Sequence, residues 1–378
     1  VISALGEVII NASPTKLLEY RLLVGKIIDE WIIDPKTGLD NGNFNPHKDK
    51  LSNGILYLLS SGNDTVSGTD QDDIMIGGNG GDTLYGEDGN DRIFVGNRSK
   101  DKLGDDGTDL SSNTAVGGGG HDTIYGSKGN DTLYGDFDST IDNLTDIILS
   151  KSGNDIIYGG EGNDTIYGGD GDDWLHGGTD SDTIYGGKGD DKIYASSPKV
   201  NEDLGGKDFL YGGEGNDTIV TDGGNDFVYA GSGNDTITAL YGTNTIFTHT
   251  DEHKGNDLDD EESENTVTLG DNNNFVYGGK GKDRVVGGSG DNTINLGDGK
   301  NKVYLGNGHN SVKTGKNDDF IVLGDASGVL GNTIYAGKGK DIVRSGSGND
   351  TINAGDDDDA DELYGGDGYD VYSVDNKR

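Results

Sequence analysis

One aspartate recurs at nine-residue intervals inside glycine-rich sequence, and carboxylates at a fixed spacing can bind cations. Residues 158–194 read YGGEGNDTIYGGDGDDWLHGGTDSDTIYGGKGDDKIY, in which nearly the same nine residues occur four times. We number the repeat by the consensus GGxGxDxUx, where U is a large aliphatic residue, so that the aspartate is at position six. The candidate metal ligands are the position-six aspartates Asp64, Asp73, Asp82, Asp91, Asp122, Asp131, Asp155, Asp164, Asp173, Asp182, Asp191, Asp217, Asp226, Asp235, Asp283, Asp341, Asp350, Asp359 and Asp370.

Aspartates two repeats apart are expected to lie directly above one another. If two nonapeptides form one coil of a solenoid, residues eighteen apart stack at the inter-strand distance of about 4.7 Å. Two carboxylates some 5 Å apart repel by roughly 3 kcal/mol at an effective dielectric constant of about 20. The uninterrupted pairs at this spacing are Asp64 with Asp82, Asp73 with Asp91, Asp155 with Asp173, Asp164 with Asp182, Asp173 with Asp191, Asp217 with Asp235, and Asp341 with Asp359.

A hard divalent cation would relieve this repulsion. Calcium takes about six to eight oxygen ligands, which stacked carboxylates and glycine carbonyls can supply, whereas magnesium requires a stricter octahedron. Zinc prefers Cys and His, and the chain has no Cys and six scattered His. The sequence therefore predicts several Ca²⁺ ions, and it predicts that coils stack only with dications between their acidic corners. Asp122 and Asp131 are expected to find a partner across an insertion or to bind weakly.

Short strands and tight turns must position these aspartates. The repeat tails DTIY and DTLY alternate polar and aliphatic residues, which is the period of two typical of a strand. In the heads, successive glycines can adopt the positive φ that tight turns need. A strand of about three residues is unstable alone, but stacked copies share ladder hydrogen bonds and an interior row of Ile and Leu. These features predict an all-β parallel solenoid.

The composition agrees with a metal-stabilised fold and excludes several classes of partner. The 378 residues include 69 Gly, and 69 Asp plus Glu against 29 Lys plus Arg give a formal charge of -40. This excess of carboxylate opposes compaction, and it disfavours binding to nucleic acid or to anionic membranes. No apolar run reaches membrane-spanning length. Because the first residue is Val1, we expect the sequence to be an excerpt of a longer chain.

Several stretches break the nine-residue spacing. Residues 95–116, 135–149, 195–211 and 239–277 are expected to be insertions or loops. Residues 270–334 are degenerate, because GGKGKD keeps Asp283 whereas GGSGDN carries Asn292 instead, so the sequence does not determine the number of ions there. The predicted blocks of the array are residues 59–94, 117–134, 150–194, 212–238, 270–334 (degenerate) and 336–378.

The N-terminal flank, residues 1–58, is of a different kind. Ser13 and Pro14 are typical of a helix N-terminus. Apolar residues follow at alternating spacings of four and three, namely Leu17, Tyr20, Val24, Ile27 and Trp31. The pattern predicts a short amphipathic helix that caps the open first coil of the solenoid. The alternative is that the flank is the tail of an upstream effector domain, and the two can both hold.

The repeated nonapeptide resembles the signature of the RTX (repeats in toxin) family over roughly residues 59–378. The resemblance implies a right-handed parallel β-roll with calcium in the turns on both flanks. It also implies export from a Gram-negative bacterium through a type I secretion channel, directed by a C-terminal signal. The copy GGDGYDVYSV, with Asp370 and Tyr372, is similar to the aromatic last repeat that such proteins place before the signal. Frequent insertions and the degenerate stretch depart from the family pattern.

These observations favour a calcium-binding module of a large secreted toxin or adhesin, located outside the cell or on the bacterial surface, that folds when it meets calcium. The alternatives are the carrier segment of an extracellular lipase, protease or epimerase, and a surface-layer or filament subunit. No catalytic motif is visible, so we expect no enzymatic activity within the segment. The outward Tyr125, Tyr158, Tyr167 and Tyr185 are expected to stack on their neighbours, and a ligand-binding aromatic stripe is the alternative. The sequence does not identify a host partner, the parent protein or the oligomeric state.

Overall fold

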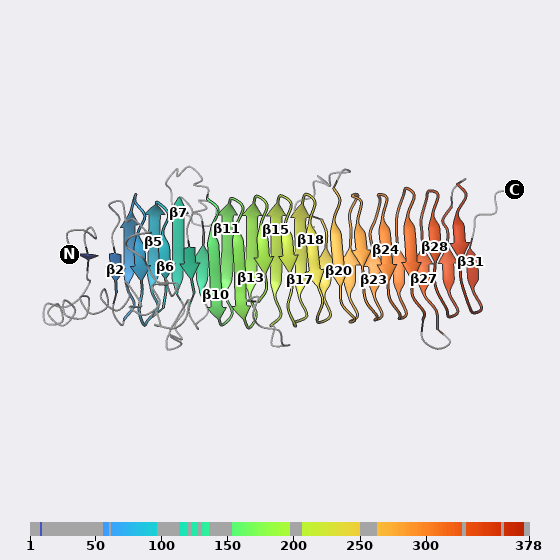
Figure 1. Ribbon diagram of the computed structural model, residues 1–378, viewed down its shortest axis with the longest axis horizontal. Coiled ribbons are helices and arrows are strands. Elements are labelled where there is room, and N and C mark those ends of the chain that lie inside the picture. The colour runs from blue at the N-terminus through green and yellow to red at the C-terminus, as the bar shows by residue number, and fades with distance from the viewer. Residues whose placement is uncertain are drawn as a thin grey trace, which may run out of the picture. The chain divides into compact units, whose positions relative to one another are not determined.

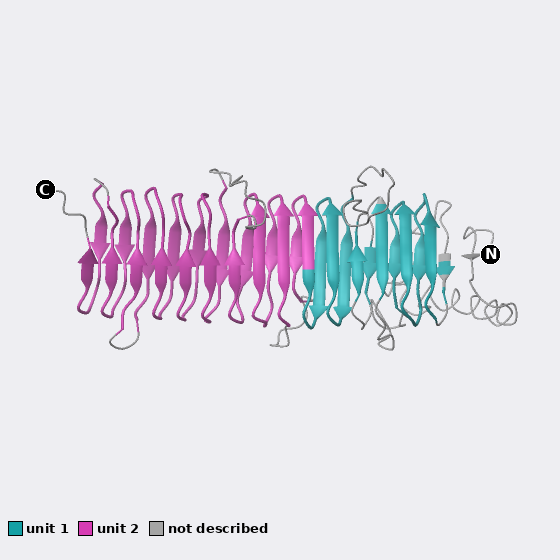
Figure 2. Ribbon diagram, turned by 180° about the vertical axis from the view of Figure 1, so that it is seen from behind, with its two compact units in different colours: residues 1–183 teal, residues 184–378 magenta. Residues whose placement is uncertain are grey.

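Short strands alternate between two parallel sheets in the computed structural model. The structure describes residues 8–9, 56–59, 62–96, 113–119, 123–126, 131–135, 153–196, 206–249, 263–326, 330–356 and 359–373. Every regular element in these ranges is a strand, and the strands are numbered β1 to β31 (Figure 1). The chain divides into two compact units, residues 1–183 and 184–378 (Figure 2), and β13 (Thr183–Lys188) lies at the boundary.

In the first unit, one sheet has the order β1-β2-β4-β6-β8-β10-β12 and the other has the order β3-β5-β7-β9-β11. Consecutive strands therefore belong to different sheets, which is the arrangement expected of a two-sided roll. The strands are β1 (Val8–Ile9), β2 (Leu56–Leu58), β3 (Thr65–Thr69), β4 (Ile74–Ile76), β5 (Thr83–Asp88), β6 (Arg92–Phe94), β7 (Thr114–Gly119), β8 (Thr123–Tyr125), β9 (Thr132–Tyr134), β10 (Ile156–Glu161), β11 (Thr165–Asp170) and β12 (Trp174–Thr179).

The second unit repeats this alternation, with the even-numbered strands from β14 to β30 in one sheet and the odd-numbered strands from β15 to β31 in the other. The strands are β14 (Lys192–Tyr194), β15 (Phe209–Glu214), β16 (Thr218–Val220), β17 (Phe227–Ser232), β18 (Thr236–Ala239), β19 (Thr245–Phe247), β20 (Thr266–Leu269), β21 (Phe275–Tyr277), β22 (Arg284–Val286), β23 (Thr293–Asn295), β24 (Lys302–Leu305), β25 (Ser311–Lys313), β26 (Phe320–Leu323), β27 (Thr333–Tyr335), β28 (Ile342–Arg344), β29 (Thr351–Asn353), β30 (Glu362–Tyr364) and β31 (Val371–Ser373).

The predicted coil of two nonapeptides is confirmed by the strand register. Thr65 of β3 pairs with Thr83 of β5, eighteen residues later, in a parallel ladder. The backbone N–H of Thr83 donates to the carbonyl oxygen of Asp64 at 2.8 Å, and equivalent bonds join coil to coil along each unit. Each coil thus depends on its neighbours for its backbone hydrogen bonds.

The aliphatic residue at position eight forms the core, as the alternation predicts. Leu84, Ile166, Ile219 and Val343 are each completely buried, and so are their equivalents in most other strands. The Thr at position seven and the residue at position nine lie on the other face of the strand, where they are mostly half-buried. The core of each unit is therefore a narrow interior layer of Ile, Leu and Val between the two sheets.

Aromatic residues at position nine stack along the outer faces of the sheets, which confirms the expected stacking. In the first unit the rings of Tyr125 and Tyr158 are 5.4 Å apart, and in the second unit the rings of Tyr211 and Tyr229 are 4.9 Å apart. The planes differ by 7° and 4° respectively, so each ring covers the face of the next. Such contacts stabilise the pairing of neighbouring strands.

The turns use the conformational freedom of glycine that the sequence predicts. Gly160 and Gly162, at positions two and four of one repeat, have φ values of 118° and 109°. An L-amino acid with a side chain rarely adopts these angles, so glycine allows the chain to reverse direction between two strands within a few residues.

Some expected interruptions are shorter than predicted. Strand β7 begins inside the stretch 95–116, β15 begins inside 195–211, and β19, β20 and β21 all lie within 239–277, so the prediction that these whole stretches are loops is wrong. Strand pairing is maintained where the nine-residue spacing fails, because the inserted residues fall between strands. The amphipathic helix predicted in the N-terminal flank lies outside the described residues.

We predict that Ile237→Ala weakens the second unit while Thr236→Ala does not. Ile237 is completely buried, and truncating such a side chain costs about 2–5 kcal/mol, whereas its neighbour Thr236 is exposed. Urea unfolding in millimolar calcium, followed by hydrogen exchange of peptides that cover β18, measures the difference. Equal midpoints for the two variants would contradict the assignment of position eight to the core.

Candidate calcium sites

The position-six aspartates directly precede the strands and are buried rather than exposed at corners. Most of the predicted ligands are at most 2% exposed, namely Asp73, Asp82, Asp91, Asp131, Asp155, Asp164, Asp173, Asp182, Asp191, Asp217, Asp226, Asp235, Asp283, Asp341 and Asp350. Asp64 and Asp370, at the first and last coils of the odd-numbered strands, are half-buried. Asp122 lies outside the described residues.

In most of these aspartates, one carboxylate oxygen accepts a hydrogen bond from the backbone N–H of the preceding coil. The backbone N–H of Asp155 donates to Oδ1 of Asp173 at 2.8 Å, and that of Asp217 donates to Oδ1 of Asp235 at 2.9 Å. The same contact joins Asp64 with Asp82, Asp73 with Asp91 and Asp164 with Asp182, so these aspartates lie in adjacent coils as predicted. The side chains form a ladder that runs along each edge where turn becomes strand.

In repeats that have glycine at position one, the second carboxylate oxygen, Oδ2, faces that glycine. A Cβ atom on Gly159 would collide with Oδ2 of Asp164 and with the carbonyl oxygen of Gly177 in the next coil. A Cβ on Gly212 would likewise collide with Oδ2 of Asp217. Only glycine leaves room for the carboxylate and the carbonyl to approach each other this closely. Glycine is therefore required at these two positions, whereas other repeats carry Ala230 or Ser345 at position one.

These oxygen atoms fit the requirements of a hard cation. Oδ2 is buried and has no hydrogen-bond partner in Asp164, Asp217 and Asp235. A buried carboxylate oxygen without a donor is costly unless a cation or a proton compensates its charge. Carboxylate and backbone carbonyl oxygens are the ligands that Ca²⁺ prefers, and bound calcium would supply positive charge to two coils at once.

Burial and neighbouring carboxylates raise the pKa values of these aspartates. The pKa of Asp164 is raised to about 9, mainly by desolvation and further by the charges of Asp182, Asp131 and Asp180. Desolvation also raises the pKa of Asp217 to about 7, with Asp235 as a contributing charge. The folded chain without metal therefore binds protons at a pH where free aspartate is ionised.

Some position-six residues were missed by the sequence analysis because the spacing around them is irregular. Asp208 follows a shortened head, GGKD, and its N–H donates to Oδ1 of Asp226 at 3.1 Å. Carboxylate oxygens of Asp208, Asp222 and Asp226 lie within 4.8 Å of one another, so this turn offers a third acid where other repeats have glycine at position two. The sequence signal that could have identified these residues is an aspartate next to a glycine pair, in GGKD for Asp208 and in TDGG for Asp222.

The last coils correct one predicted pair. The N–H of Asp341 donates to Oδ1 of Asp361 at 2.9 Å, so the predicted pairing of Asp341 with Asp359 is wrong. Asp359 is exposed, because two additional residues in the acidic run DDDDADE shift the register. The N–H of Asp350 bonds to Asp370 at 3.1 Å across the same twenty-residue interval.

Two further aspartates show how the ladder crosses irregular spacing. Asp131 finds the partner expected across an insertion, since its N–H donates to Oδ1 of Asp164 at 2.7 Å. Asp319, which the sequence analysis missed, donates its N–H to Oδ1 of Asp341 at 2.8 Å.

Position five carries a second, more exposed ladder that the sequence analysis also missed. Oδ1 of Asn163 accepts the N–H of Ser181 at 2.9 Å, and Oδ1 of Asn154 accepts the N–H of Asp172 at 3.0 Å. Asp190 makes the same contact to Asn216 at 2.7 Å. The frequent triplet GND was the signal, because Asn and Asp are the short side chains that can reach the backbone of the next coil.

Asparagine replaces aspartate at position six in part of the structure, and there the coils stack without an aspartate at every level. The asparagines in the ladder are Asn113, Asn244, Asn265, Asn274, Asn292, Asn301, Asn310 and Asn332. The prediction that coils stack only through dications at acidic corners is therefore wrong for these coils.

Comparison with known families identifies this repeat. A family model described as the RTX calcium-binding nonapeptide repeat (4 copies) matches residues 60–94, 104–141, 142–175, 167–197, 204–248, 259–294, 277–312, 296–330 and 327–360. The chain belongs to this RTX family. A search of curated proteins found no match.

Family membership agrees with the chemistry of the ladder. RTX repeats bind calcium, and proteins that carry them are typically secreted from bacteria by type I systems. In the described parts of the chain no helix has the length and the apolar character needed to cross a bilayer.

We predict that the calcium-free protein gains strand structure as the pH is lowered. The raised pKa values mean that protonation of the aspartates stabilises the folded state; this stabilisation is complete below about pH 4 and is lost as the pH rises through about 6 to 9. Circular dichroism in a chelator should therefore show more strand signal at pH 5 than at pH 8. A stronger signal at pH 8 would contradict the assignment of buried, mutually repelling carboxylates.

Proposed function

We propose that this chain is a calcium-dependent folding module of a large secreted bacterial toxin or adhesin. The observation that carries the proposal is the buried Oδ2 of Asp164, Asp217 and Asp235, which lacks a donor. A charge of -40 spread over such sites opposes folding until a cation is present. Binding energy of calcium then becomes folding energy.

The difference in calcium concentration between the two sides of the bacterial envelope makes folding of the chain depend on its export. Where calcium is scarce, the repelling aspartates keep the chain extended, and an extended chain can pass through a type I secretion channel. Outside the cell, calcium modules typically bind at roughly 10⁻⁴ to 10⁻³ M, so the ladder fills and the coils stack. The segment acts by folding and binding and has no catalytic role. Its site of action is the extracellular space or the bacterial surface.

We predict that calcium converts the chain from coil to strand. In a chelator at pH 8, circular dichroism should be dominated by coil, and titration with calcium should produce strand signal with a midpoint near 10⁻⁴ to 10⁻³ M, an order-of-magnitude expectation for extracellular sites. A chain that is already fully folded in the chelator, with no change on adding calcium, would rule out calcium-dependent folding.

A matched pair of variants locates the effect in the ladder. Asp217→Ala removes one buried carboxylate together with the hydrogen bond that its Oδ1 accepts from the N–H of Asp191, and it should raise the calcium midpoint for coils β15–β18 about 5- to 150-fold, equivalent to ~1–3 kcal/mol lost from a contact of a charged group. Glu214→Gln removes the same charge from an exposed side chain three residues away and should leave the midpoint within about twofold, as expected of a surface charge. Calorimetric titration and hydrogen exchange of the two variants give the comparison. Equal midpoints would show that Asp217 does not bind the cation.

A further inference from the structure

In the second unit the position-six ladder consists largely of asparagine over one continuous series of coils. We call residues 263–335, which carry β20 to β27, the asparagine segment. Position six is aspartate only at Asp283 and Asp319 there, and elsewhere it is occupied by Asn265, Asn274, Asn292, Asn301, Asn310 and Asn332. All six asparagines are at most 4% exposed.

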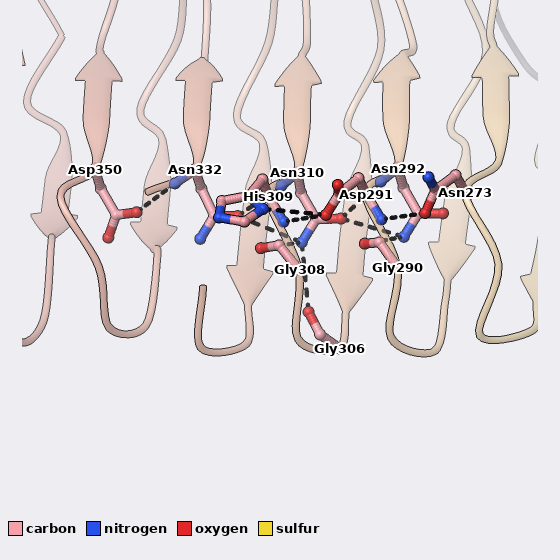
Figure 3. Close-up of polar contacts among 10 residues, drawn as sticks. All are labelled: Asn273, Gly290, Asp291, Asn292, Gly306, Gly308, His309, Asn310, Asn332 and Asp350. Carbon is pink, nitrogen blue, oxygen red and sulfur yellow. Dashed lines mark hydrogen bonds and ion pairs between the residues drawn. The ribbon is translucent and has the colours of Figure 1, made fainter. Parts of the chain in front are cut away.

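The asparagines keep the backbone contact that the aspartates make. The N–H of Asn274 donates to Oδ1 of Asn292 at 3.0 Å, and the N–H of Asn292 donates to Oδ1 of Asn310 at 3.1 Å. Along the same row, the N–H of Asn310 bonds to Asn332 at 2.9 Å and that of Asn332 bonds to Asp350 at 2.6 Å. Figure 3 shows Asn292, Asn310, Asn332 and Asp350 of this row, in which the side chains of the last three accept a hydrogen bond from the backbone of the adjacent coil.

The second side-chain atom is what distinguishes asparagine from aspartate. Nδ2 of Asn292 donates to the carbonyl oxygen of Gly290 at 3.1 Å (Figure 3), and Nδ2 of Asn274 donates to that of Asn272 at 2.8 Å. Nδ2 of Asn332 donates to the carbonyl oxygen of Ser345 at 2.8 Å. An amide nitrogen thus donates to backbone carbonyls at the place where an aspartate presents a second acceptor. These coils need neither a cation nor a proton to satisfy position six.

The turns of the asparagine segment also contain ion pairs between lysines and acidic residues of adjacent coils. Lys282 pairs with Glu264 at 2.6 Å, Lys316 pairs with Asp298 at 2.7 Å, and Lys300 pairs with Asp318 at 2.9 Å. Each pair joins residues eighteen apart, so a lysine in one coil lies beside an acid in the next. Exposed pairs such as these stabilise the fold only slightly, but they replace the stacking of like charges.

The two aspartates that remain in the segment are separated by asparagine. Asp283 lies between Asn265 and Asn301 in its row, and its Oδ1 accepts hydrogen bonds from Nδ2 of Asn265 at 3.2 Å and from Oγ1 of Thr248 at 3.1 Å. Asp319 is preceded by Asn301 in the same row. Asp283 therefore has asparagine on both sides, and only Asp319, near the end of the segment, has an aspartate next to it in its row, namely Asp341 outside the segment.

We propose that the asparagine segment folds without calcium and forms the stack on which the neighbouring aspartate coils of the second unit are completed when calcium binds. This inference rests on the proposed calcium-dependent function and assigns the calcium requirement to particular coils. A solenoid coil is stabilised by its nearest neighbours, so a folded segment offers ladder partners to the next coil and lowers the calcium concentration at which that coil folds.

Hydrogen exchange of the intact 378-residue chain tests the inference. In a chelator at pH 8, we expect the amides of β21 to β25 to exchange about tenfold or more slowly than those of β15 to β18, because only the former retain a folded stack. Adding millimolar calcium should then slow exchange in β15 to β18. If β21 to β25 exchange freely in the chelator but become protected with calcium, the inference is wrong and the proposed function stands. If calcium protects neither region, the proposed function is wrong.

Two double variants with the same change of net charge isolate the ladder. Asn292→Asp with Asn310→Asp places two carboxylates in adjacent coils of the buried row, and it should remove the protection of β21 to β25 in the chelator, restore it in calcium, and raise the calcium midpoint of β15 to β18. Asn295→Asp with Lys313→Gln changes the charge by the same amount on the outer face of paired strands, and it should leave all three quantities unchanged. Full protection of the Asn292→Asp, Asn310→Asp chain in the chelator would overturn the inference.

Discussion

The fold depends on one contact, in which the side chain at position six accepts a hydrogen bond from the backbone of the preceding coil. The bond from Asp217 N–H to Asp235 Oδ1 and the bond from Asn292 N–H to Asn310 Oδ1 have the same geometry, although one acceptor is a carboxylate and the other is an amide. Each coil must bury this group because its turn reverses against the turns above and below. Where position one is glycine, as at Gly159 and Gly212, a Cβ atom there would occupy the space of the position-six side chain. Aspartate and asparagine are the residues short enough to make this contact and polar enough to need it.

The identity of the second side-chain atom then determines what else a coil requires. In an aspartate the second atom is an acceptor that faces other acceptors, and its burial raises the pKa of residues such as Asp164 and Asp217 well above the value of a free carboxyl group. In an asparagine the second atom is a donor, and the turn carbonyls satisfy it. The difference between a coil that requires a cation and one that does not is thus a difference of one atom in a side chain of constant shape. The backbone of the roll does not change with it.

The sequence predicted the parts of this structure that follow from a period. The eighteen-residue register, the buried row at position eight, the outward aromatic stacks and the pairs such as Asp64 with Asp82 all follow from residue spacing. Predictions from the sequence failed where the strands remain paired although the number of residues between repeats is not nine. Partners in the ladder lie thirty residues apart at Asp235 and Asn265, and twenty apart at Asp341 and Asp361, because strands pair by their hydrophobic pattern while the connecting turns vary in length. Counting by nines therefore selected Asp359 in place of Asp361 and treated Asn244 and Asn265 as parts of a loop.

In the degenerate stretch, the position-six side chain keeps its shape although it has lost its charge at most coils. Residues 270–334 lack the position-six aspartate in several repeats. At every coil, however, they retain a position-six side chain that accepts a backbone N–H. A roll built only of aspartate coils would require each coil to gain calcium before its neighbour could stack on it. A roll built only of asparagine coils would fold wherever it was made and could not be held open for export. Each coil of a solenoid is stabilised by its neighbours. Asparagine in one continuous series of coils therefore separates the stability of the stack from its dependence on calcium, which the nonapeptide otherwise combines. In the division we propose, the asparagine coils make the stack stable, and the aspartate coils make its completion depend on calcium.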